Sequence, residues 1–420
     1  MSVRAIIGFS VMRCVRYARR SRSLCLRVSN ATPRMGPASQ HRPRVAVLAP
    51  YLPAPADSGG RIRVARLCAA LARRAELDLY ARASRDEIDR HSEHPSLAPF
   101  ARRHLSARPL GWARAPGTSR RVRDAAPPSL RARLALHLAA GTYDLVVGCH
   151  STSLALLPRG CGAPVVLDEH NVESRYAAEV DPDPRESARL SAWEARVWPR
   201  VSLVTTVSAA DRDVIARARR GPVEVVENGV DLASIPYAPP SSRRGHALLF
   251  VGSMAHRPNA EAAVWLAREV LPRVRRRHPD ATLVLCGRDP GPEVLALRSD
   301  AVSVTGTVAD VRPFLADAAV YANALRGGAG TSLKVVEALA AGVPMVSTRV
   351  GVRGYAEAES FARLADEVEG FVDAVCLVLA DPSAMDPFAE RGRALATSLS
   401  WDRLGDRFAS LALSLIGARP

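Results

Sequence analysis

Lysine is almost absent from this 420-residue chain: Lys334 is the only one among 58 lysine and arginine residues. Arginine supplies the basic charge everywhere else, so a lone lysine indicates a position where a guanidinium does not serve. One physical reason is a compact ammonium beside a phosphate, because a guanidinium is bulkier and planar. The alternative is a chance lysine on a solvated helix face.

Cysteine is also sparse in pattern, with seven residues scattered along the chain and no CxxC spacing. This argues against a zinc site and against a disulfide framework, and it favours reduced thiols in a cytoplasmic setting. No apolar run approaches the roughly 18 residues that a membrane-spanning helix needs. The 48% apolar and 24% charged fractions are typical of a globular protein, and the length predicts two domains.

Acidic residues are missing from residues 1–44, which therefore supply much of the net charge of +16. The short apolar piece at residues 5–12 is followed closely by arginines, so it makes a poor signal peptide. We interpret residues 1–43 as a disordered leader or an artefact of start-site choice, with Met35 as the real start. A basic leader is also compatible with peripheral binding to an anionic membrane surface. The lack of interleaved aromatic and basic residues argues against nucleic acid.

The most informative stretch runs from Asn323 to Thr348 and predicts a loop, a helix, a turn and a strand. Thr331 or Ser332 can cap the first N–H groups of the helix. Gly342 is a typical residue after a helix end, and Pro344 prevents the helix from resuming. The stretch therefore resembles the last part of an α/β unit.

Glycines precede this helix, and Lys334 and Glu337 lie in its first turns. Glycines before a helix N-terminus allow backbone N–H groups to surround an anion, which the helix dipole also favours. Lys334 and Glu337 are three residues apart, so their side chains can point the same way. The predicted anion site includes Gly327, Gly328 and Gly330.

The rest of the chain predicts two successive α/β units joined by a Pro-, Ser- and Arg-rich linker at residues 237–245. The expected strands of the first unit are at residues 44–49, 77–80, 143–148, 164–168, 202–207 and 223–226. Those of the second are at residues 247–251, 282–286, 302–305, around Val320 and around Val346. A long helix capped by Asn259 is expected after the first strand of the second unit. Residues 82–130 lack clear periodicity and are interpreted as surface helices and loops on the acceptor side of a cleft.

Polar residues follow two apolar strands of the first unit. His150 comes after one, and the run from Asp168 to Asn171, which includes His170, comes after the other. In open α/β sheets, ligands bind beyond the carboxyl ends of the strands. A histidine flanked by carboxylates can act as a general base or hydrogen-bond a substrate hydroxyl. The alternative is a surface or capping cluster at a strand end.

Each unit also carries a glycine loop after its first strand, at Gly59-Gly60 and at Gly252-Ser253. Both loops can face one cleft, an arrangement that suits a diphosphate on one side and a second substrate on the other. Neither loop is a GxGxxG fingerprint, so a dinucleotide oxidoreductase is improbable. The Gly59-Gly60 pair can equally be a simple turn.

The ordered motifs resemble the group 1 (family 4) retaining glycosyltransferases of the GT-B fold, which have two Rossmann-like domains facing across a cleft. The resemblance covers roughly residues 44–415. Its motifs are the Gly59-Gly60 loop, the His170 segment, TTVS (205–208), VENGVD (226–231), GSM…PN (252–259), LCG (285–287), VTGTVAD (304–310) and GAGTSLKVVEALAAGVPMVST (328–348).

The resemblance implies an α/β fold with an N-terminal acceptor-side domain at residues 44–238. It also implies a C-terminal domain at residues 246–398 that binds the nucleotide sugar, and a last helix at residues 399–420 that packs back on the N-terminal domain. The implied activity is transfer of a sugar from a nucleotide diphosphate sugar to a glycan, a lipid-linked glycan or a small molecule. We expect no cofactor and no metal ion. We also expect a cytoplasmic location, with peripheral association at the inner membrane surface as a further possibility for the basic leader.

The resemblance also assigns site residues. Lys334 would contact the diphosphate, Glu337 would accept the ribose hydroxyls, and His170 would lie near the donor sugar, so that His170 and Lys334 are the expected catalytic residues. The other donor-binding residues would be Gly252, Ser253, Gly328, Gly330, Thr331, Ser332 and Leu333. Gly59, Gly60 and His150 would line the cleft.

This chain departs from the family pattern at Ala329, where members commonly carry a glutamate eight residues before the position of Glu337. The usual carboxylate contact to the sugar is therefore missing, and backbone groups of the loop can replace it. The family's basic residue after the first C-terminal strand is matched by Arg257 or Arg288. The alternative function is a non-catalytic GT-B protein that binds a nucleotide or a partner.

Overall fold

The computed structural model describes residues 42–107, 118–181, 183–327, 333–355 and 357–417. The predicted leader at residues 1–43 lies outside these ranges, apart from its last two residues. The site predictions for Gly328, Gly330, Thr331 and Ser332, and the departure at Ala329, also lie outside them. The described part of the chain from Arg42 onward forms one compact unit.

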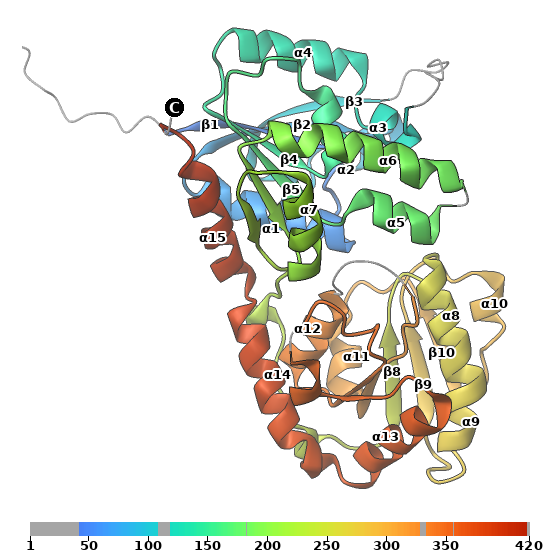
Figure 1. The fold of residues 1–420 in the computed structure, drawn as a ribbon. Coiled ribbons are helices and arrows are strands. Elements are labelled where there is room, and N and C mark those ends of the chain that lie inside the picture. Colours follow the sequence, from blue (N-terminus) through green and yellow to red (C-terminus); the bar gives the residue numbers. More distant parts are fainter. Residues whose placement is uncertain (1–41, 108–117, 182, 328–332, 356, 418–420) are drawn as a thin grey trace, which may run out of the picture. The chain divides into compact units, whose positions relative to one another are not determined.

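The first sheet contains seven parallel strands in the order β3-β2-β1-β4-β5-β6-β7 (Figure 1). Its strands are β1 (Arg44–Ala49), β2 (Glu76–Arg82), β3 (Phe100–Ser106), β4 (Leu145–Cys149), β5 (Val165–Glu169), β6 (Leu203–Thr206) and β7 (Val223–Val225). The accompanying helices are α1 (Gly59–Ala72), α2 (Arg85–His91), α3 (Arg120–Asp124), α4 (Pro128–Ala139), α5 (Glu173–Val180), α6 (Pro184–Val197) and α7 (Ala209–Ala218).

The second sheet contains six parallel strands in the order β10-β9-β8-β11-β12-β13. Its strands are β8 (Ala247–Val251), β9 (Thr282–Cys286), β10 (Val302–Gly306), β11 (Val320–Asn323), β12 (Met345–Ser347) and β13 (Ala362–Leu364). The remaining helices are α8 (Arg257–Trp265), α9 (Leu271–Val274), α10 (Pro292–Leu295), α11 (Arg312–Asp317), α12 (Leu333–Ala341), α13 (Val368–Ala380), α14 (Asp386–Ser398) and α15 (Trp401–Leu413). Both sheets have the doubly wound strand order of a Rossmann-like unit, which confirms the predicted fold class.

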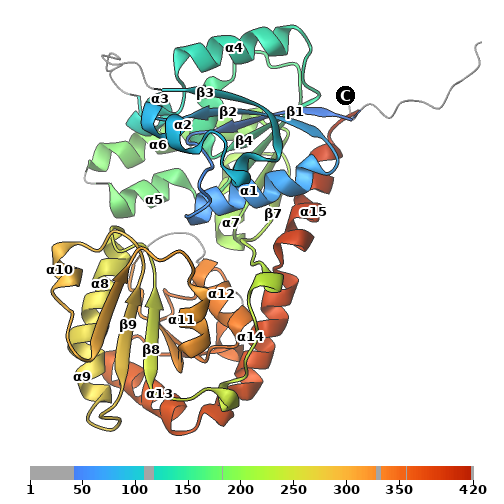
Figure 2. The same cartoon turned by 180° about the vertical axis from the view of Figure 1, so that it is seen from behind.

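Helices cover both faces of each sheet, because the strands bury apolar side chains on both sides. In β1, Val45 and Val47 pack in one cluster with α1, whereas Ala46 and Leu48 pack in another with α4. In β8, Phe250 packs on the side of α8 and α9, which Figure 2 shows on one face of the second sheet, with α12 on the other. Because all strands of a sheet are parallel, their carboxyl ends lie at the same edge. The loops that follow the strands extend from this edge.

The C-terminal helix α15 lies beside α1 of the first sheet, as both views show (Figures 1 and 2). Arg73, the residue directly after α1, pairs with Asp406 of α15 at 2.5 Å. An added Cβ at Gly405 would lie 2.6 Å from the Cβ of Ala70, so glycine is needed for the close approach of the two helices. The exact domain limits remain a prediction, although the strands change from one sheet to the other between residues 225 and 247.

The interpretation of residues 82–130 as helices and loops was wrong at β3, which spans Phe100–Ser106. This strand lies at the end of the strand order, so only one of its edges pairs with a neighbour. Edge strands carry charged side chains, which hide the apolar pattern that marks a buried strand. Arg102 and Arg103 supply such charges here.

The prediction that Asn259 caps a long helix was also wrong. The residue before α8 is His256, and Asn259 lies inside the first turn with its side chain buried. The helical run that starts there contains a π-helical segment at Leu266–Val270 and continues as α9. The buried amide of Asn259 has a different role, in the candidate site below.

Two absences concern the described residues only. None of their helices combines the length and the apolar character that spanning a membrane requires. Their five cysteines, Cys68, Cys149, Cys161, Cys286 and Cys376, are all free thiols.

Candidate active site

A cleft of about 1500 Å³ is lined by loops from the carboxyl ends of both sheets. Every described residue of the predicted site lines it: Gly59, Gly60, His150, His170, Gly252, Ser253, Leu333, Lys334 and Glu337. These residues lie up to 278 positions apart in the sequence. They meet in the folded protein because both sheets turn the carboxyl ends of their strands toward the cleft.

Lys334 is held by two residues of the first α/β element of the second sheet. Its Nζ donates to Oδ1 of Asn259 at 2.8 Å and lies 4.7 Å from the ring centre of Phe250. The amide nitrogen of Asn259 in turn donates to the carbonyl of Ser253 at 2.8 Å. Burial lowers the pKa of Lys334 to about 7, and a bound anion would favour its charged form. This is the geometry of a pre-positioned cation rather than of a solvated surface lysine.

Glu337 lies one helical turn after Lys334 and also lines the cleft. Burial raises the pKa of its carboxyl to about 7. The two side chains point to the same cavity, as their spacing in α12 predicts. A carboxyl in this position can exchange hydrogen bonds with ligand hydroxyls.

On the opposite side of the cleft, Asp168 is the second-last residue of β5 and is buried. It accepts two hydrogen bonds from Arg63 of α1, at 2.9 and 2.7 Å, and one from Thr205 at 2.7 Å. Arg63 also donates to the carbonyl of Glu227, which lies in the VENGVD motif, at 2.9 Å. Burial alone would raise the pKa of Asp168, but the Arg63 guanidinium and His170 hold it well below its usual range. The motif thus contributes a carbonyl that fixes a buried arginine.

His170 follows this carboxylate, with its Nε2 3.0 Å from Oδ2 of Asp168. Neither ring nitrogen forms a hydrogen bond with a residue in the described part of the chain, and both nitrogens are shielded from solvent. Burial and the neighbouring His150 lower the pKa of His170 to about 4. The imidazole is therefore neutral at neutral pH, and the residue lines the cleft.

His150 occupies a strained position beside His170, with φ 62° and ψ 143° and the two ring centres 3.9 Å apart. Its Nδ1 contacts Oε1 of Glu173 at 2.7 Å, and its Nε2 contacts the hydroxyl of Tyr51 at 2.9 Å. Positive φ in a non-glycine residue costs on the order of 1–3 kcal/mol and persists where surrounding contacts enforce it. The chain Glu173–His150–Tyr51 supplies those contacts, and Tyr51 lines the cleft.

Sequence reasoning missed several residues of this wall, among them Tyr51, Arg63 and Glu173. Arg63 is one of many arginines in the chain, so the composition gives no reason to single it out as a site residue. Asn259 lies in the quoted GSM…PN motif, and that was the available signal for it. Of the two arginines considered as the basic residue after β8, Arg288 lines the cleft and pairs with Asp57 at 3.0 Å, whereas Arg257 pairs with Glu261 on an exposed surface.

Gly60 has no room for a side chain. An added Cβ would lie 2.5 Å from the hydroxyl oxygen of Tyr51 and 3.4 Å from Nδ1 of His170. We expect Gly60→Ala to displace Tyr51, to lower activity by more than tenfold and to destabilise the fold by about 1–3 kcal/mol. Gly291→Ala is the matched control, because nothing lies within 4 Å of its added Cβ. Steady-state kinetics and urea denaturation of both variants check this, and equal behaviour would contradict the packing argument.

The neutral state of His170 predicts a pH effect on stability. Its pKa of about 4 lies below the roughly 6.5 of an unfolded histidine. Protonation therefore favours the unfolded chain, with no penalty above about pH 6.5 and a growing penalty as the pH falls toward 4. Between about pH 7.5 and about pH 5, the wild type should lose roughly 2 kcal/mol more unfolding free energy than His170→Gln. Urea denaturation at both pH values measures this, and identical losses would show that the imidazole is not held neutral.

The comparisons with known proteins agree with this architecture. Residues 58–234 match the family model described as Glycosyltransferase Family 4, and residues 245–381 match Glycosyl transferases group 1. Glycogen synthase of Mycobacterium tuberculosis is 30% identical over 230 residues, which are 51% of this chain and 54% of that protein. The chain thus matches about half the length of these curated relatives.

Two solved structures illustrate the similarity in fold. Sucrose-phosphate synthase from Thermosynechococcus elongatus superposes with a TM-score of 0.71 at 19% identity, covering 90% of this chain and all of that one (100%). HepE from Anabaena, in complex with UDP, gives a TM-score of 0.64 at 15% identity, covering 88% of this chain and 100% of that one.

Proposed function

Because the chain belongs to the group 1 (family 4) glycosyltransferases with the GT-B fold, we propose that it transfers a sugar from a nucleotide diphosphate sugar to an acceptor. One observation carries the proposal. The only lysine of the chain is half-buried beside Asn259 and Phe250 in a cleft between two Rossmann-like sheets. A cation held in this way can stabilise the negative charge that develops on a leaving diphosphate.

The donor would bind to the wall formed by the second sheet. Lys334 and the N-terminus of α12 would face the diphosphate, Gly252 and Ser253 would lie near the phosphates, and Glu337 would accept the ribose hydroxyls. Related structures of HepE contain UDP, UDP with glucose, and UDP-glucose, which supports a nucleotide sugar as the donor here.

On the first-sheet wall, neutral His170 would lie near the donor sugar. The transferred sugar would keep its anomeric configuration, an inference that rests on the family resemblance alone. Closure of the cleft around both substrates would align them and exclude water. The acceptor would then be a glycan, a lipid-linked glycan or a small molecule that enters over the first sheet.

The protein's own charges would stabilise the leaving group without a metal ion or a further cofactor. Lys334 supplies the positive side chain, and the backbone N–H groups at the start of α12 supply a partial positive charge. Transfer at an unchanged rate in excess EDTA is the expected result. A rate that falls with EDTA and returns with Mg²⁺ would contradict this part of the proposal.

The test of function is a titration of the purified protein with UDP, GDP, ADP and NAD, followed by turnover assays with the sugar conjugates of the nucleotides that bind. We expect one nucleoside diphosphate to bind, and its sugar conjugate to release that diphosphate faster in the presence of an acceptor panel. Binding of NAD alone would point to an oxidoreductase. Nucleotide binding without turnover of any donor would favour a non-catalytic binding protein.

A further inference from the structure

Arginines gather on the part of the cleft wall that belongs to the first sheet. Strand β2 ends at Arg82, and the short helix α3 begins at Arg120 and Arg121. All three residues line the cleft, together with Tyr51, which follows β1. They lie on elements of the first sheet, whereas Lys334 and Asn259 of the proposed donor site lie on elements of the second.

Most cleft arginines of this wall already have a carboxylate partner. Arg61 lies 2.9 Å from Glu87, Arg63 lies 2.7 Å from Asp168, and Arg121 lies 3.5 Å from Glu173. Their charges are therefore largely compensated within the fold.

Arg82 and Arg120 differ from these residues. The Nε of Arg82 donates to the carbonyl of Pro50 at 3.2 Å, and its two terminal nitrogens form no hydrogen bond or ion pair with any described residue. The guanidinium of the exposed Arg120 likewise has no hydrogen-bond or ion-pair partner in the part of the chain that the structure describes; only its backbone N–H is bonded. A guanidinium carries five N–H donors, so both side chains keep unused donors at the cleft. The charge of Arg82 also acts on the carboxylate of Glu87, which already pairs with Arg61, so it is compensated only in part.

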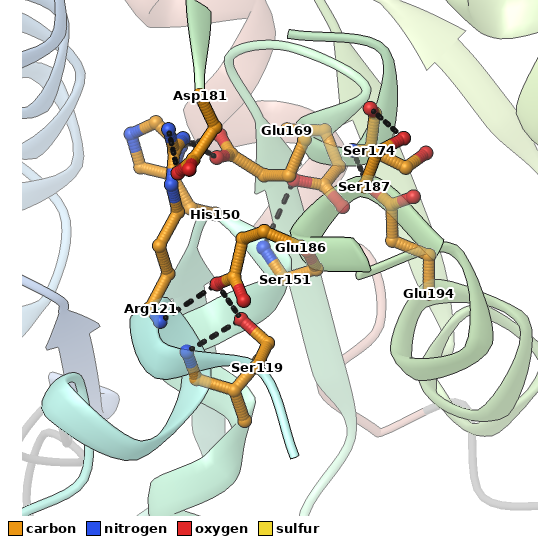
Figure 3. A network of polar contacts seen from close by, with 12 residues as sticks. Ser119, Arg121, His150, Ser151, Glu169, Ser174, Asp181, Glu186, Ser187 and Glu194 are labelled. Carbon is orange, nitrogen blue, oxygen red and sulfur yellow. Dashed lines mark hydrogen bonds and ion pairs between the residues drawn. The ribbon is translucent and has the colours of Figure 1, made fainter. Parts of the chain in front are cut away.

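Hydrogen bonds to Glu186 position the backbone that carries Arg120; Figure 3 shows Glu186 beside the neighbouring residues Ser119 and Arg121. The buried carboxylate of Glu186 accepts from the hydroxyl of Ser119 at 2.6 Å and from the backbone N–H groups of Arg120 and Arg121 at 3.3 and 3.2 Å. The N–H groups at the start of α3 are thus already occupied by a carboxylate. At the start of α3, the arginine side chains rather than the backbone N–H groups are therefore the donors that a ligand can contact.

We propose that the acceptor carries an anionic group, a phosphate or a carboxylate, which Arg82 and Arg120 bind. The proposal rests on the glycosyltransferase function proposed above and adds the chemical class of the second substrate. Planar guanidinium groups match phosphate and carboxylate oxygens through paired hydrogen bonds. Arg82 is held to Pro50, which follows β1 and directly precedes Tyr51, so the anion would be fixed near Tyr51 on the cleft wall.

The test is a calorimetric titration of the protein with matched neutral and anionic probes, first alone and then with the best-binding nucleoside diphosphate at saturation. The probes are glucose, glucose 6-phosphate, glucuronate and dihexanoyl phosphatidylglycerol, so that a soluble phosphate, a carboxylate and a lipid phosphate are separated. The proteins are the wild type, the double variant Arg82→Gln/Arg120→Gln, and the control Arg85→Gln. Arg85 is exposed, lies three residues after Arg82, and does not line the cleft.

We expect at least one anionic probe to bind the wild type on the order of 10- to 100-fold more tightly than glucose, as charged hydrogen bonds would give. The double variant should lose this preference, while Arg85→Gln keeps it and all three proteins bind the nucleotide equally. Equal binding of neutral and anionic probes to the wild type would overturn the proposal, and so would a preference that survives in the double variant.

Failure of the proposed function gives a different pattern. In that case none of the nucleoside diphosphates binds, yet an arginine-dependent preference for anions in the nucleotide-free titration would still establish the anion site. Nucleotide binding without an anion preference would leave the donor function intact and remove only the inference about the acceptor.

Discussion

Replacing Lys334 with alanine is expected to lower the rate of sugar transfer by about 100- to 1,000-fold, which corresponds to the loss of one pre-positioned charge on a developing anion. The Nζ of Lys334 lies 2.8 Å from Oδ1 of Asn259 and 4.7 Å from the ring centre of Phe250. This space is shaped for a compact ammonium. Lys334→Arg should therefore lose most of the activity as well, although it keeps the charge. Steady-state kinetics with the identified donor measure both effects.

Arg257→Gln is the control for a nearby basic residue. Its side chain pairs with Glu261 at 2.7 Å on an exposed surface and does not line the cleft, so activity should stay close to that of the wild type. Full activity of Lys334→Arg would contradict the argument that only an ammonium fits. Full activity of Lys334→Ala would remove Lys334 from the mechanism.

Arg63→Met is expected to lower the free energy of unfolding by about 3–5 kcal/mol, because it leaves a buried carboxylate without its partner. Arg63 and Asp168 are both only 1% exposed, and two hydrogen bonds of 2.9 and 2.7 Å join them. Methionine keeps much of the volume of the side chain, so the loss reports the unpaired charge rather than a large cavity. Urea denaturation near neutral pH measures the change.

Arg66→Met, in the same helix, is the matched control. Arg66 pairs with Asp231 at 2.9 Å, but the two side chains are 46% and 38% exposed, and such pairs contribute about 1 kcal/mol or less. A double variant, Arg63→Met/Asp168→Leu, removes both buried charges and should regain part of the lost stability. Equal losses in Arg63→Met and Arg66→Met would show that burial of the pair does not determine its contribution.

The sequence allowed most of the strands to be predicted, because parallel strands buried on both faces are continuous apolar runs. Strands β8 and β9 lie at the predicted residues. Strand β3 was missed because it lies at the edge of the first sheet and carries charged side chains. The N-cap of α8 was misassigned to Asn259, since an asparagine before an apolar run has the signature of a cap whether or not its side chain serves as one.

Local pattern also predicted which loops line the cleft. Glycines and polar residues directly after strands must lie at the carboxyl edge of a parallel sheet, and the structure places the two glycine loops, His150 and His170 there. Asp168 and Glu169 instead belong to β5 and do not line the cleft. Their partners were not predictable. Nothing in the sequence around Glu173 indicates that it contacts His150, or that His150 contacts Tyr51, because these pairs arise from strands and helices that meet only after folding.

The fold class, the family and the special position of Lys334 therefore follow from residue order and composition, because they depend on periodicity, motif order and the rarity of one residue type. The ammonium site of Lys334, the buried Arg63–Asp168 pair and the guanidinium groups of Arg82 and Arg120, which form no ion pair within the described part of the chain, follow only from the tertiary structure. All basic residues except Lys334 are arginines. The charge of an arginine therefore does not reveal from the sequence whether it belongs to the site. Only burial and the presence or absence of a carboxylate partner separate a structural arginine from one that is available to a substrate.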